Sequence, residues 1–384
     1  MADVTNWLRI RAKLRQFPHL YGTLRFLRNV CPYLLREFAR TFGIGFRFGA
    51  ARGFFSGLQL VRSGSAEGEL IFTGQSLPPL PDHSMIRHCG MNQNARQPWP
   101  VFWARFPNAR LVGPALAVVD SSKKLMLESV YGEEFCHGAC SNNYTILDKP
   151  YFLSGSWTSV VGEFPGFYHW LTDAMPRLAL LEKFPADTRI IVRTPYGPSQ
   201  NESLAMLGLL DRVRETTENH LLVEDFCFSS PTSMTGCVNP YAVGWLREQF
   251  LKHEAPAATP TRFFITRKAK TRGIRNLSEL VDFFLSFGWA VLDMEELTFS
   301  EQIAFFRNAE MIVGEHGAAF TNLLWCRPEC RIVELFPHNY LNGCYEAISI
   351  CLGLDHRFHV FEADSGHAFH VPIDILKSTI NAAT

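Results

Sequence analysis

The stretch Met311-Ile-Val-Gly-Glu-His-Gly-Ala-Ala-Phe-Thr-Asn322 decides the fold of the region around it. Its apolar residues up to Gly314 predict a buried strand, and the residues after Gly317 predict a helix. Glu315 and His316 stand between the two. A glycine at such a turn permits close approach of the backbone, and the free N–H groups of a helix N-terminus suit a phosphate. The stretch therefore predicts a phosphate site, whereas an isolated His-Gly pair would only cap or pack a helix.

Strands and helices alternate regularly on both sides of this stretch. Strands that alternate with helices of about 10–15 residues form a doubly wound parallel sheet, which binds ligands beyond the carboxyl ends of its strands. The sequence thus predicts an α/β, Rossmann-like domain over residues 236–384, with a last segment that stays in it or packs back on the preceding domain. The predicted strands are 262–266, 290–293, 311–314, 331–336 and 357–361, and the predicted helices are 277–287, 300–308, 318–325 and 340–352.

Charged residues follow the predicted strand ends at two further places. Glu334 closes the strand after the opening stretch, where a carboxylate can hold both hydroxyls of a nucleotide ribose or pair with an arginine. After the strand 262–266 come five cations in nine residues, a density that suits a diphosphate but also occurs in solvated loops. Arg267 lies nearest the strand end and ranks first in a cluster of Arg267, Lys268, Lys270, Arg272 and Arg275.

A second candidate site lies in a predicted helix at Gly166-Phe-Tyr-His-Trp-Leu-Thr-Asp-Ala-Met-Pro-Arg177. Residues four apart share a helix face, so His169, Asp173 and Arg177 align, although Pro176 interrupts such a helix. A carboxylate beside an imidazole orients it and makes it a better acceptor of a hydroxyl proton. The alternative is a structural histidine near the helix start and a structural Asp–Arg pair.

Both segments resemble the signatures of glycosyltransferase family 61, and the resemblance covers about residues 165–337. Residues 167–178 resemble the first signature. The resemblance implies a GT-B architecture of two Rossmann-like domains facing across a cleft. It also implies an inverting, metal-independent transfer from nucleotide sugars such as UDP-xylose or UDP-N-acetylglucosamine. The second signature is matched by Arg267, Arg272, Asn276, residues 299–302, Ala309, residues 314–318, Asn322, Pro328 and Glu334.

Inversion requires one in-line displacement at the anomeric carbon, with a base beside the acceptor hydroxyl. We expect His169 or Asp173 to be this base and the other to orient it, with Glu315 as the reserve candidate. Asn322 is expected to pack or cap a helix, although the family pattern keeps it on the donor side. The expected donor-binding residues are Arg267, Arg272, Glu315, His316, Gly317, Ala318, Asn322 and Glu334, and Tyr168 and Arg177 are expected on the acceptor side.

The expected partners follow from this resemblance. They are a nucleotide sugar, with a UDP-sugar first, and an oligosaccharide or lipid-linked saccharide acceptor of a bacterial capsule or other surface polysaccharide. No Asp-x-Asp triplet occurs, so arginines and a helix N-terminus would neutralise the diphosphate, and we expect neither metal nor other cofactor. Two rival functions are a nucleotide-sugar epimerase on the same frame and a non-catalytic saccharide-binding subunit of a polysaccharide assembly complex.

Composition and charge restrict the remaining interpretations. The chain has 384 residues, of which 47% are hydrophobic, and 37 basic residues balance 37 acidic ones. A disordered chain is thereby excluded, and a nucleic-acid partner is not expected. Residues 1–62 depart from this balance, because eleven basic side chains there are interleaved with large apolar ones. They predict a helical arm that lies on an anionic membrane surface or packs on the protein's own body.

The remaining expectations concern location and the central region. The sequence lacks a signal peptide's apolar segment and any run of about 18 apolar residues, so we expect a cytoplasmic protein that is peripheral on the inner membrane face. Residues 63–235 are expected to form the acceptor-side α/β domain. Within it the sequence predicts irregular loops with few regular elements over 63–107, a β-hairpin of 111–119 and 124–130, helices over 166–184 and 199–210, and strands over 189–194 and 221–228.

Overall fold

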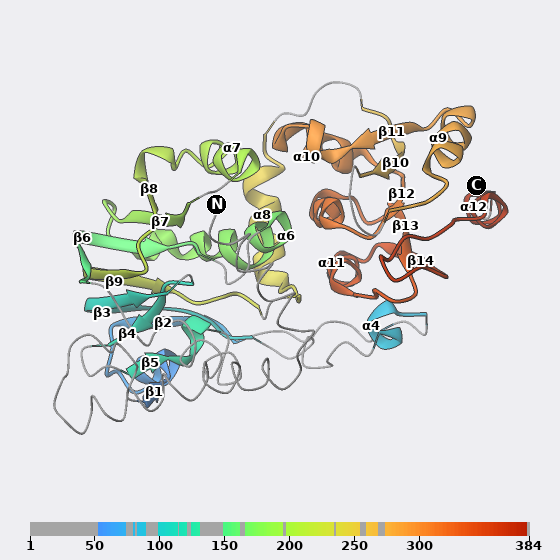
Figure 1. The fold of residues 1–384 in the computed structure, drawn as a ribbon. Coiled ribbons are helices and arrows are strands. Elements are labelled where there is room, and N and C mark those ends of the chain that lie inside the picture. Colours follow the sequence, from blue (N-terminus) through green and yellow to red (C-terminus); the bar gives the residue numbers. More distant parts are fainter. Residues whose placement is uncertain are drawn as a thin grey trace. The chain divides into compact units, whose positions relative to one another are not determined.

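The protein has a mixed α/β fold of sheets and helices in the computed structural model (Figure 1). The predicted basic arm lies outside the described residues except for 53–62, and so does Arg272 with the centre of the basic loop. The expectations for these segments stay predictions. The structure describes residues 53–73, 80, 83–89, 99–113, 115–120, 124–130, 149–161, 166–194, 197–233, 236–253, 259–267 and 273–381.

The chain divides into two compact units, each built from several segments. The first unit contains the described residues of three segments. These are the segment that ends at Glu67, Arg105–Trp157 and Thr217–Phe226. The second unit contains the described parts of Gly68–Ala104, Thr158–Thr216 and Cys227–Thr384. The domain boundaries expected from the sequence and the GT-B arrangement stay predictions.

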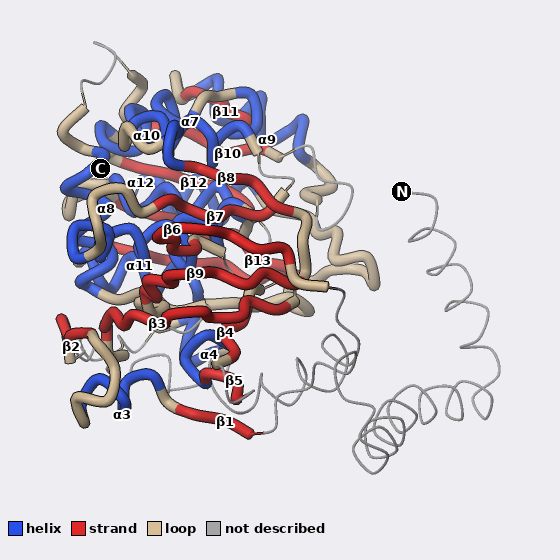
Figure 2. The backbone as a smooth tube through the Cα atoms, turned by 90° about the vertical axis from the view of Figure 1, so that its left-hand side faces the viewer, coloured by secondary structure: helices blue, strands red, loops and turns tan. Residues whose placement is uncertain are grey.

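The first unit is a sheet in which the strand order is β1-β5-β4-β3-β9-β6, and Figure 2 shows β4, β3 and β9 side by side. Strand β1 runs parallel to β5 and β6 parallel to β9, whereas β4 is antiparallel to β3 and β5. The elements are β1 (Gly53–Phe55), α3 (Gly57–Arg62), β3 (Val101–Val112), β4 (Ala117–Val119), β5 (Lys124–Met126), the 3-10 turn Leu127–Val130, β6 (Tyr151–Ser159) and β9 (His220–Ser229), of which β3, β6 and β9 continue into the second unit.

One expectation for this region is wrong in part. Residues 111–119 are not one strand, because the chain turns between β3 and β4 at Gly113 and Leu116, which both have positive φ. The long apolar run hid this turn, although the expected antiparallel pairing with the strand that begins at Lys124 is present between β4 and β5. The few regular elements expected within residues 63–107 are β2 (Gly68–Phe72), α4 (Met85–His88) and the start of β3. The polar and glycine-rich composition masked the positions of these short elements.

The second unit contains a five-stranded sheet of order β11-β10-β12-β13-β14, in which every pair is parallel. The alternation predicted over residues 262–361 is confirmed, with bounds that differ by few residues. Figure 1 shows α9, α10 and α11 beside these strands. The elements are β10 (Arg262–Thr266), α9 (Leu277–Ser286), β11 (Ala290–Asp293), α10 (Phe299–Asn308), β12 (Met311–Glu315), the 3-10 helix η7 (Ala318–Trp325), β13 (Arg331–Pro337), α11 (Cys344–Leu352) and β14 (Asp355–Phe361).

The order of these strands fixes where the sheet can bind a ligand. In chain order the strands are arranged 2-1-3-4-5, so the direction of winding reverses between β10 and β12, and sheets of this kind bind ligands at such a reversal, beyond the carboxyl ends of the strands. Gly314 lets these two strands pack closely, because a Cβ built on it would lie 2.9 Å from Ile265 Cβ. Phe263, Phe264 and Trp325 are fully buried in the core around the sheet.

The remaining elements of the second unit precede or follow this sheet. Strand β2 is antiparallel to the first residues of β3, and β7 is parallel to β8. A continuous but irregular helical segment covers residues 167–183. The sequence did not predict β6, β8, α8 or the C-terminal helix. The bounds are β7 (Arg189–Arg193), α7 (Pro198–Met206), the 3-10 turn Leu210–Arg212, β8 (Val213–Thr216), α8 (Pro240–Phe250), the 3-10 turn Met294–Glu296 and α12 (Ile373–Asn381).

A short helix from early in the chain docks on the sheet region. Glu346, on the first turn of α11, accepts hydrogen bonds of 2.8 Å from the Ser84 hydroxyl and the Ile86 backbone N–H, which stand at the start of α4. Gly343 is required beside this contact, because a Cβ there would lie 2.5 Å from Ile86 Cγ1. Glu346 is 2% exposed, so hydrogen bonds from the N-terminus of α4 replace those that water would donate to its carboxylate.

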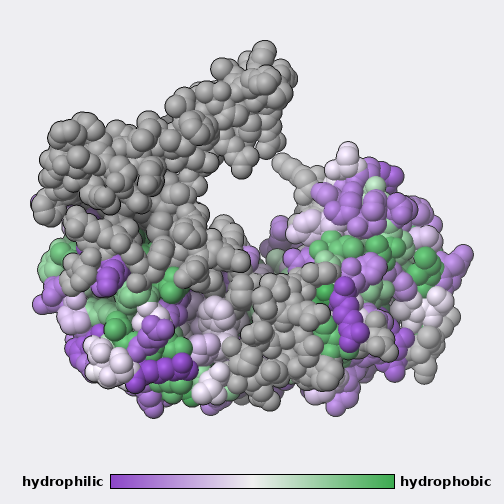
Figure 3. All heavy atoms as spheres, turned by 90° about the horizontal axis from the view of Figure 1, so that it is seen from below, coloured by the Kyte–Doolittle hydropathy of each residue, from purple (hydrophilic) through white to green (hydrophobic). Residues whose placement is uncertain are grey.

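Hydrophobic and hydrophilic residues are mixed on the described surface of the face in Figure 3. Among the described residues, none of the helices has the length and apolar character that a membrane crossing requires.

Candidate functional site

The residues that follow β10 and β12 lie at the carboxyl ends of the two strands between which the winding reverses. Arg267 follows β10, and its Nη1 donates a hydrogen bond of 3.1 Å to the backbone carbonyl of His316, which follows β12. Gly317 packs on the same guanidinium, since a Cβ built there would lie 3.2 Å from Nη1. Ala318, at the start of η7, is exposed. The predicted convergence of a cation and a turn into a helix is therefore present at the winding reversal of the sheet.

The imidazole of His316 is held from inside the protein. Its Nδ1 lies 2.6 Å from Glu334 Oε1, and the two side chains are 5% and 1% exposed. The other carboxylate oxygen, Oε2, lies 3.1 Å from His356 Nε2. Burial acts to raise the pKa of Glu334, but the charge and hydrogen bond of His316, with those of His356, lower it below the ordinary value. Glu334 is therefore an ionised carboxylate with both oxygens engaged.

The second predicted cluster lies on a segment that changes its helical form twice. Residues Phe167–His169 form an α-helical turn, Trp170–Ala174 a π-helical turn and Met175–Lys183 a 3-10 helix that has Pro176 at its start. The proline cannot continue an α-helix, which accounts for the change of form near it. Single π-helical turns inside helices occur frequently at functional sites.

His169 and Asp173 form a pair on this segment. His169 Nδ1 lies 2.8 Å from Asp173 Oδ2; the imidazole is 27% exposed and the carboxylate is not exposed. The Thr172 hydroxyl donates to the other oxygen, Oδ1, at 2.7 Å. Arg177 does not pair with this carboxylate in the described contacts, since its Nε donates to the Asp173 backbone carbonyl at 3.2 Å. The carboxylate is thus fixed on both sides, and it orients an imidazole that reaches the surface.

The two clusters meet at Tyr345 on α11. Its ring centroid is 5.0 Å from that of His316 and 5.6 Å from that of Tyr168, whose own ring is 5.2 Å from that of His169. Burial raises the pKa of the Tyr168 phenol, and Cys344 and then Asp173 raise it further. Burial likewise raises the pKa of Tyr345. Both phenols are therefore neutral aromatic spacers between the two histidines.

Other predicted donor-side residues are inside the protein. Asn322 is fully buried; its Nδ2 donates to Gln302 Oε1 at 2.8 Å, and its Oδ1 accepts from Trp325 Nε1 at 3.0 Å. Gln302 in turn donates to the backbone carbonyl of Met294. Glu315 is the last residue of β12 and is 4% exposed. Asn322 therefore ties η7 to α10, in keeping with a packing role.

Several residues at the site have no clear signal in the sequence. Tyr345, His356 and Ser349 come after the two signatures in the sequence and match neither. Each is a single polar or aromatic residue in an apolar segment. Their only signal is position, because a serine inside the apolar helix 344–352 and a histidine at the start of the next strand fall near the carboxylate of β13. Tyr340 lies in the loop after β13; it is 38% exposed, and its ring centroid is 5.7 Å from that of His316.

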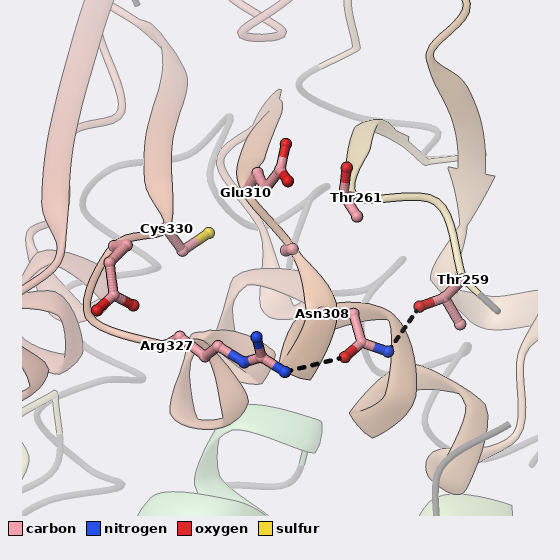
Figure 4. Close-up of a pocket in the computed structure, with 8 residues that line it drawn as sticks. Thr259, Thr261, Asn308, Glu310, Arg327 and Cys330 are labelled. Atoms are coloured by element: carbon pink, nitrogen blue, oxygen red, sulfur yellow. Dashed lines mark hydrogen bonds between the residues drawn. The ribbon is translucent and has the colours of Figure 1, made fainter. Parts of the chain in front are cut away.

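A separate pocket of about 560 Å³ lies at the opposite, amino edge of the sheet (Figure 4). Arg327 donates to Asn308 Oδ1, and Asn308 donates to the Thr259 hydroxyl. Glu310 and Glu329 also line it, so its lining contains one arginine and two carboxylates, and this balance of charge does not suit a diphosphate. Over the described ranges, no cluster of three or more histidine, cysteine, aspartate or glutamate side chains has an arrangement that could hold a metal ion.

Comparison with known proteins agrees with this geometry. The family model described as Glycosyltransferase 61 matches residues 167–333, which include the His169–Asp173 pair and the turn after β12. A search of curated proteins gave no significant match. The resemblance seen in the sequence is confirmed by the family match, which supports transferase activity with a sugar donor and an acceptor. The match to residues 167–333 therefore supports an assignment to glycosyltransferase family 61.

Proposed function

We propose that the protein is an inverting, metal-independent glycosyltransferase that moves a sugar from a UDP-sugar to a saccharide acceptor in surface polysaccharide biosynthesis. One observation carries the proposal. A His–Asp pair with a partly exposed imidazole and an arginine-backed turn at the winding reversal of the sheet converge on Tyr345. A group transfer needs both parts, a base for the acceptor and a cationic site for the leaving group.

On the donor side, the diphosphate lies at the turn after β12 in this proposal. Arg267 is partly exposed and supplies a cation, and the exposed N-terminal turn of η7 supplies backbone N–H groups. His316 lies between them. Glu334 was expected to bind ribose, but both of its oxygens contact histidines, so we propose that it holds His316 instead. Tyr340, at the rim, offers an exposed ring to the nucleotide or the sugar.

On the acceptor side, we propose that His169 is the base and that Asp173 orients it. The imidazole takes the proton of the acceptor hydroxyl as that oxygen attacks the anomeric carbon from the side opposite the diphosphate. The bond between the anomeric carbon and the diphosphate oxygen breaks, and its electron pair leaves with the nucleoside diphosphate. Asp173 suits the orienting role, because it is buried and fixed by Thr172, whereas His169 is the exposed partner.

A donor screen followed by a product assay tests this function. UDP, other nucleoside diphosphates and their sugars are compared by thermal shift, because a ligand that binds the folded state raises its apparent stability. The stabilising sugar nucleotide is then incubated with and without oligosaccharide acceptors, and the product is examined by NMR. We expect release of the nucleoside diphosphate only with acceptor, and an inverted anomeric configuration. A rearranged sugar nucleotide formed without acceptor would instead identify an epimerase.

The basic N-terminal segment gives this enzyme a proposed place at a membrane. We propose that it holds the protein on an anionic surface near a lipid-linked acceptor, because its cations alternate with large apolar residues. Deletion of residues 1–52, which ends before β1, should abolish sedimentation with phosphatidylserine-containing vesicles. Transfer to a soluble acceptor fragment should change less than about twofold, since the arm acts at the surface alone. Equal vesicle binding by both forms would argue that the arm packs on the protein.

A further inference from the structure

Four buried side chains form a continuous hydrogen-bonded chain behind the donor turn. Ser349 Oγ on α11 lies 2.7 Å from His356 Nδ1 on β14, and His356 Nε2 lies 3.1 Å from Glu334 Oε2. Glu334 Oε1 lies 2.6 Å from His316 Nδ1. None of the four residues is more than 6% exposed. We call this set the relay. It links β13, α11 and β14, which follow one another in the chain, to the turn after β12.

The contacts define which atoms of the relay carry protons. Glu334 is ionised and accepts at both oxygens, so the hydrogens lie on His316 Nδ1 and His356 Nε2. The remaining nitrogen of a neutral His356 is Nδ1, which accepts the hydrogen of the Ser349 hydroxyl. This arrangement satisfies every polar side-chain atom of Ser349, His356 and Glu334 in the relay. Within the described part of the chain, His316 Nε2 has no hydrogen-bond partner.

The other groups that face the relay do not provide a competing charge. Cys344 and Tyr345, on α11, have pKa values raised by burial and then by neighbouring groups that include Glu334, so both stay neutral. Tyr340 and Phe336 contact the His316 ring by their own rings. Arg267 contacts the His316 backbone carbonyl rather than its ring. Among the residues that the structure describes, only the two histidines therefore contact the Glu334 carboxylate by hydrogen bonds.

We propose that Ser349 and His356 are positioning residues that act through Glu334 on His316. They fix the carboxylate so that the proton of the imidazole stays on Nδ1, which leaves Nε2 as an acceptor that is presented to a ribose hydroxyl of the nucleotide donor. The hydroxyl part of this inference rests on the proposed function, whereas the proton arrangement does not. An ordered carboxylate behind a histidine sets both its tautomer and its orientation, so a change at Ser349 reaches the ligand through three residues, which are His356, Glu334 and His316.

The full-length protein labelled with ¹⁵N-histidine provides a direct test. Long-range ¹H–¹⁵N spectra distinguish the two tautomers, and the His316→Gln variant assigns the His316 signals. We expect Nδ1–H in the wild type and a shift towards a mixture in Ser349→Ala and His356→Phe, with UDP affinity lowered about 3-fold and 10-fold. His359→Phe is the control, because it changes a histidine of the same strand that contacts Thr379 instead. It should alter neither readout.

The two readouts separate the possible failures. An unchanged His316 tautomer in folded Ser349→Ala and His356→Phe would overturn the relay, whatever the UDP affinity. A shifted tautomer with unaltered UDP affinity would overturn the link to the ribose hydroxyl. If His356→Phe does not fold, Ser349→Ala decides, since it removes one hydroxyl and adds no volume. A wild type that binds no nucleotide contradicts the proposed function, whereas the tautomer measurement needs no ligand and still judges the proton arrangement.

Discussion

The molecule contains two histidine–carboxylate pairs of nearly equal geometry in different surroundings. His169 and Asp173 lie 2.8 Å apart on an irregular helical segment, and His316 and Glu334 lie 2.6 Å apart at the edge of a parallel sheet. In the first pair the imidazole is 27% exposed, whereas in the second it is 5% exposed. An exposed imidazole can exchange its proton with an arriving substrate, while a buried one is held in a single state. Similar chemistry therefore suits proton transfer at one place and fixed orientation at the other.

The largest effect is expected at the exposed pair. His169→Ala and Asp173→Asn should each lower kcat by about 10²–10⁴-fold, which is the loss expected for a positioned base. The double variant should be little worse than the worse single one, because paired groups act as a unit. Steady-state kinetics with the donor found by the screen measures this, and UDP affinity should change little. His253→Gln is a control outside both pairs. Near-normal turnover in the single variants would contradict the assignment of the base to this pair and would favour Glu315 instead.

Removing the charge of the buried pair should lower the stability of the protein. Glu334→Gln removes a buried charge from two histidines and should lower the free energy of unfolding by about 3–5 kcal/mol at pH 7. Urea unfolding measures this loss. Glu329→Gln, at an exposed carboxylate, is the matched control and should change little.

The same variant has a defined pH dependence. The folded-state pKa of Glu334 lies below its ordinary value, so its ionised form stabilises the fold above the ordinary carboxyl pKa. That contribution is lost as the pH falls through the lower, folded-state pKa. Wild-type stability should therefore fall more steeply with acid than that of Glu334→Gln. Parallel curves would mean that the buried pair is not the ionic one, and the contrast with His169 and Asp173 would disappear.

A smaller effect is expected from the arginine beside the turn. Arg267→Ala should weaken UDP binding about 10–100-fold, since a hydrogen bond to a charged group contributes about 1.5–3 kcal/mol. Arg262→Ala is the matched control, because Arg262 begins the same strand at its other end, where it pairs with Glu310. Isothermal titration with UDP compares the two. Equal losses would show that net charge, rather than position at the carboxyl edge, governs binding.

The smallest effect is expected from a chelator. Excess EDTA should leave turnover unchanged, because cations and backbone N–H groups neutralise the diphosphate in the proposed mechanism. The same assay with added magnesium or manganese completes the comparison. Activity lost with EDTA and restored by either ion would require a metal that the proposal does not include.

The two regions also differ in how far the sequence predicts them. Over residues 262–361 each strand is a short apolar run followed by an amphipathic helix, so local pattern and final structure agree. Around Asp173 the pairing with His169 follows from spacing, but the π-helical turn depends on tertiary packing and on Pro176. The relay could not be predicted, because Ser349 and His356 meet Glu334 only after three elements have packed. Strand β6 was missed since Gly155 interrupts its alternation and its first residues face solvent.

The docking of α4 on α11 has a consequence for dissecting the protein. A fragment cut at the bounds of the family match, 167–333, would end inside β13 before Glu334 and would lack helix α11 and the outer strand β14. Even a fragment extended to the C-terminus would leave Glu346 without Ser84 and Ile86, and an uncompensated buried carboxylate is costly. The smallest autonomous folding unit is therefore discontinuous in sequence. Minimal forms should retain the α4 segment, through a short linker if the intervening strands are removed.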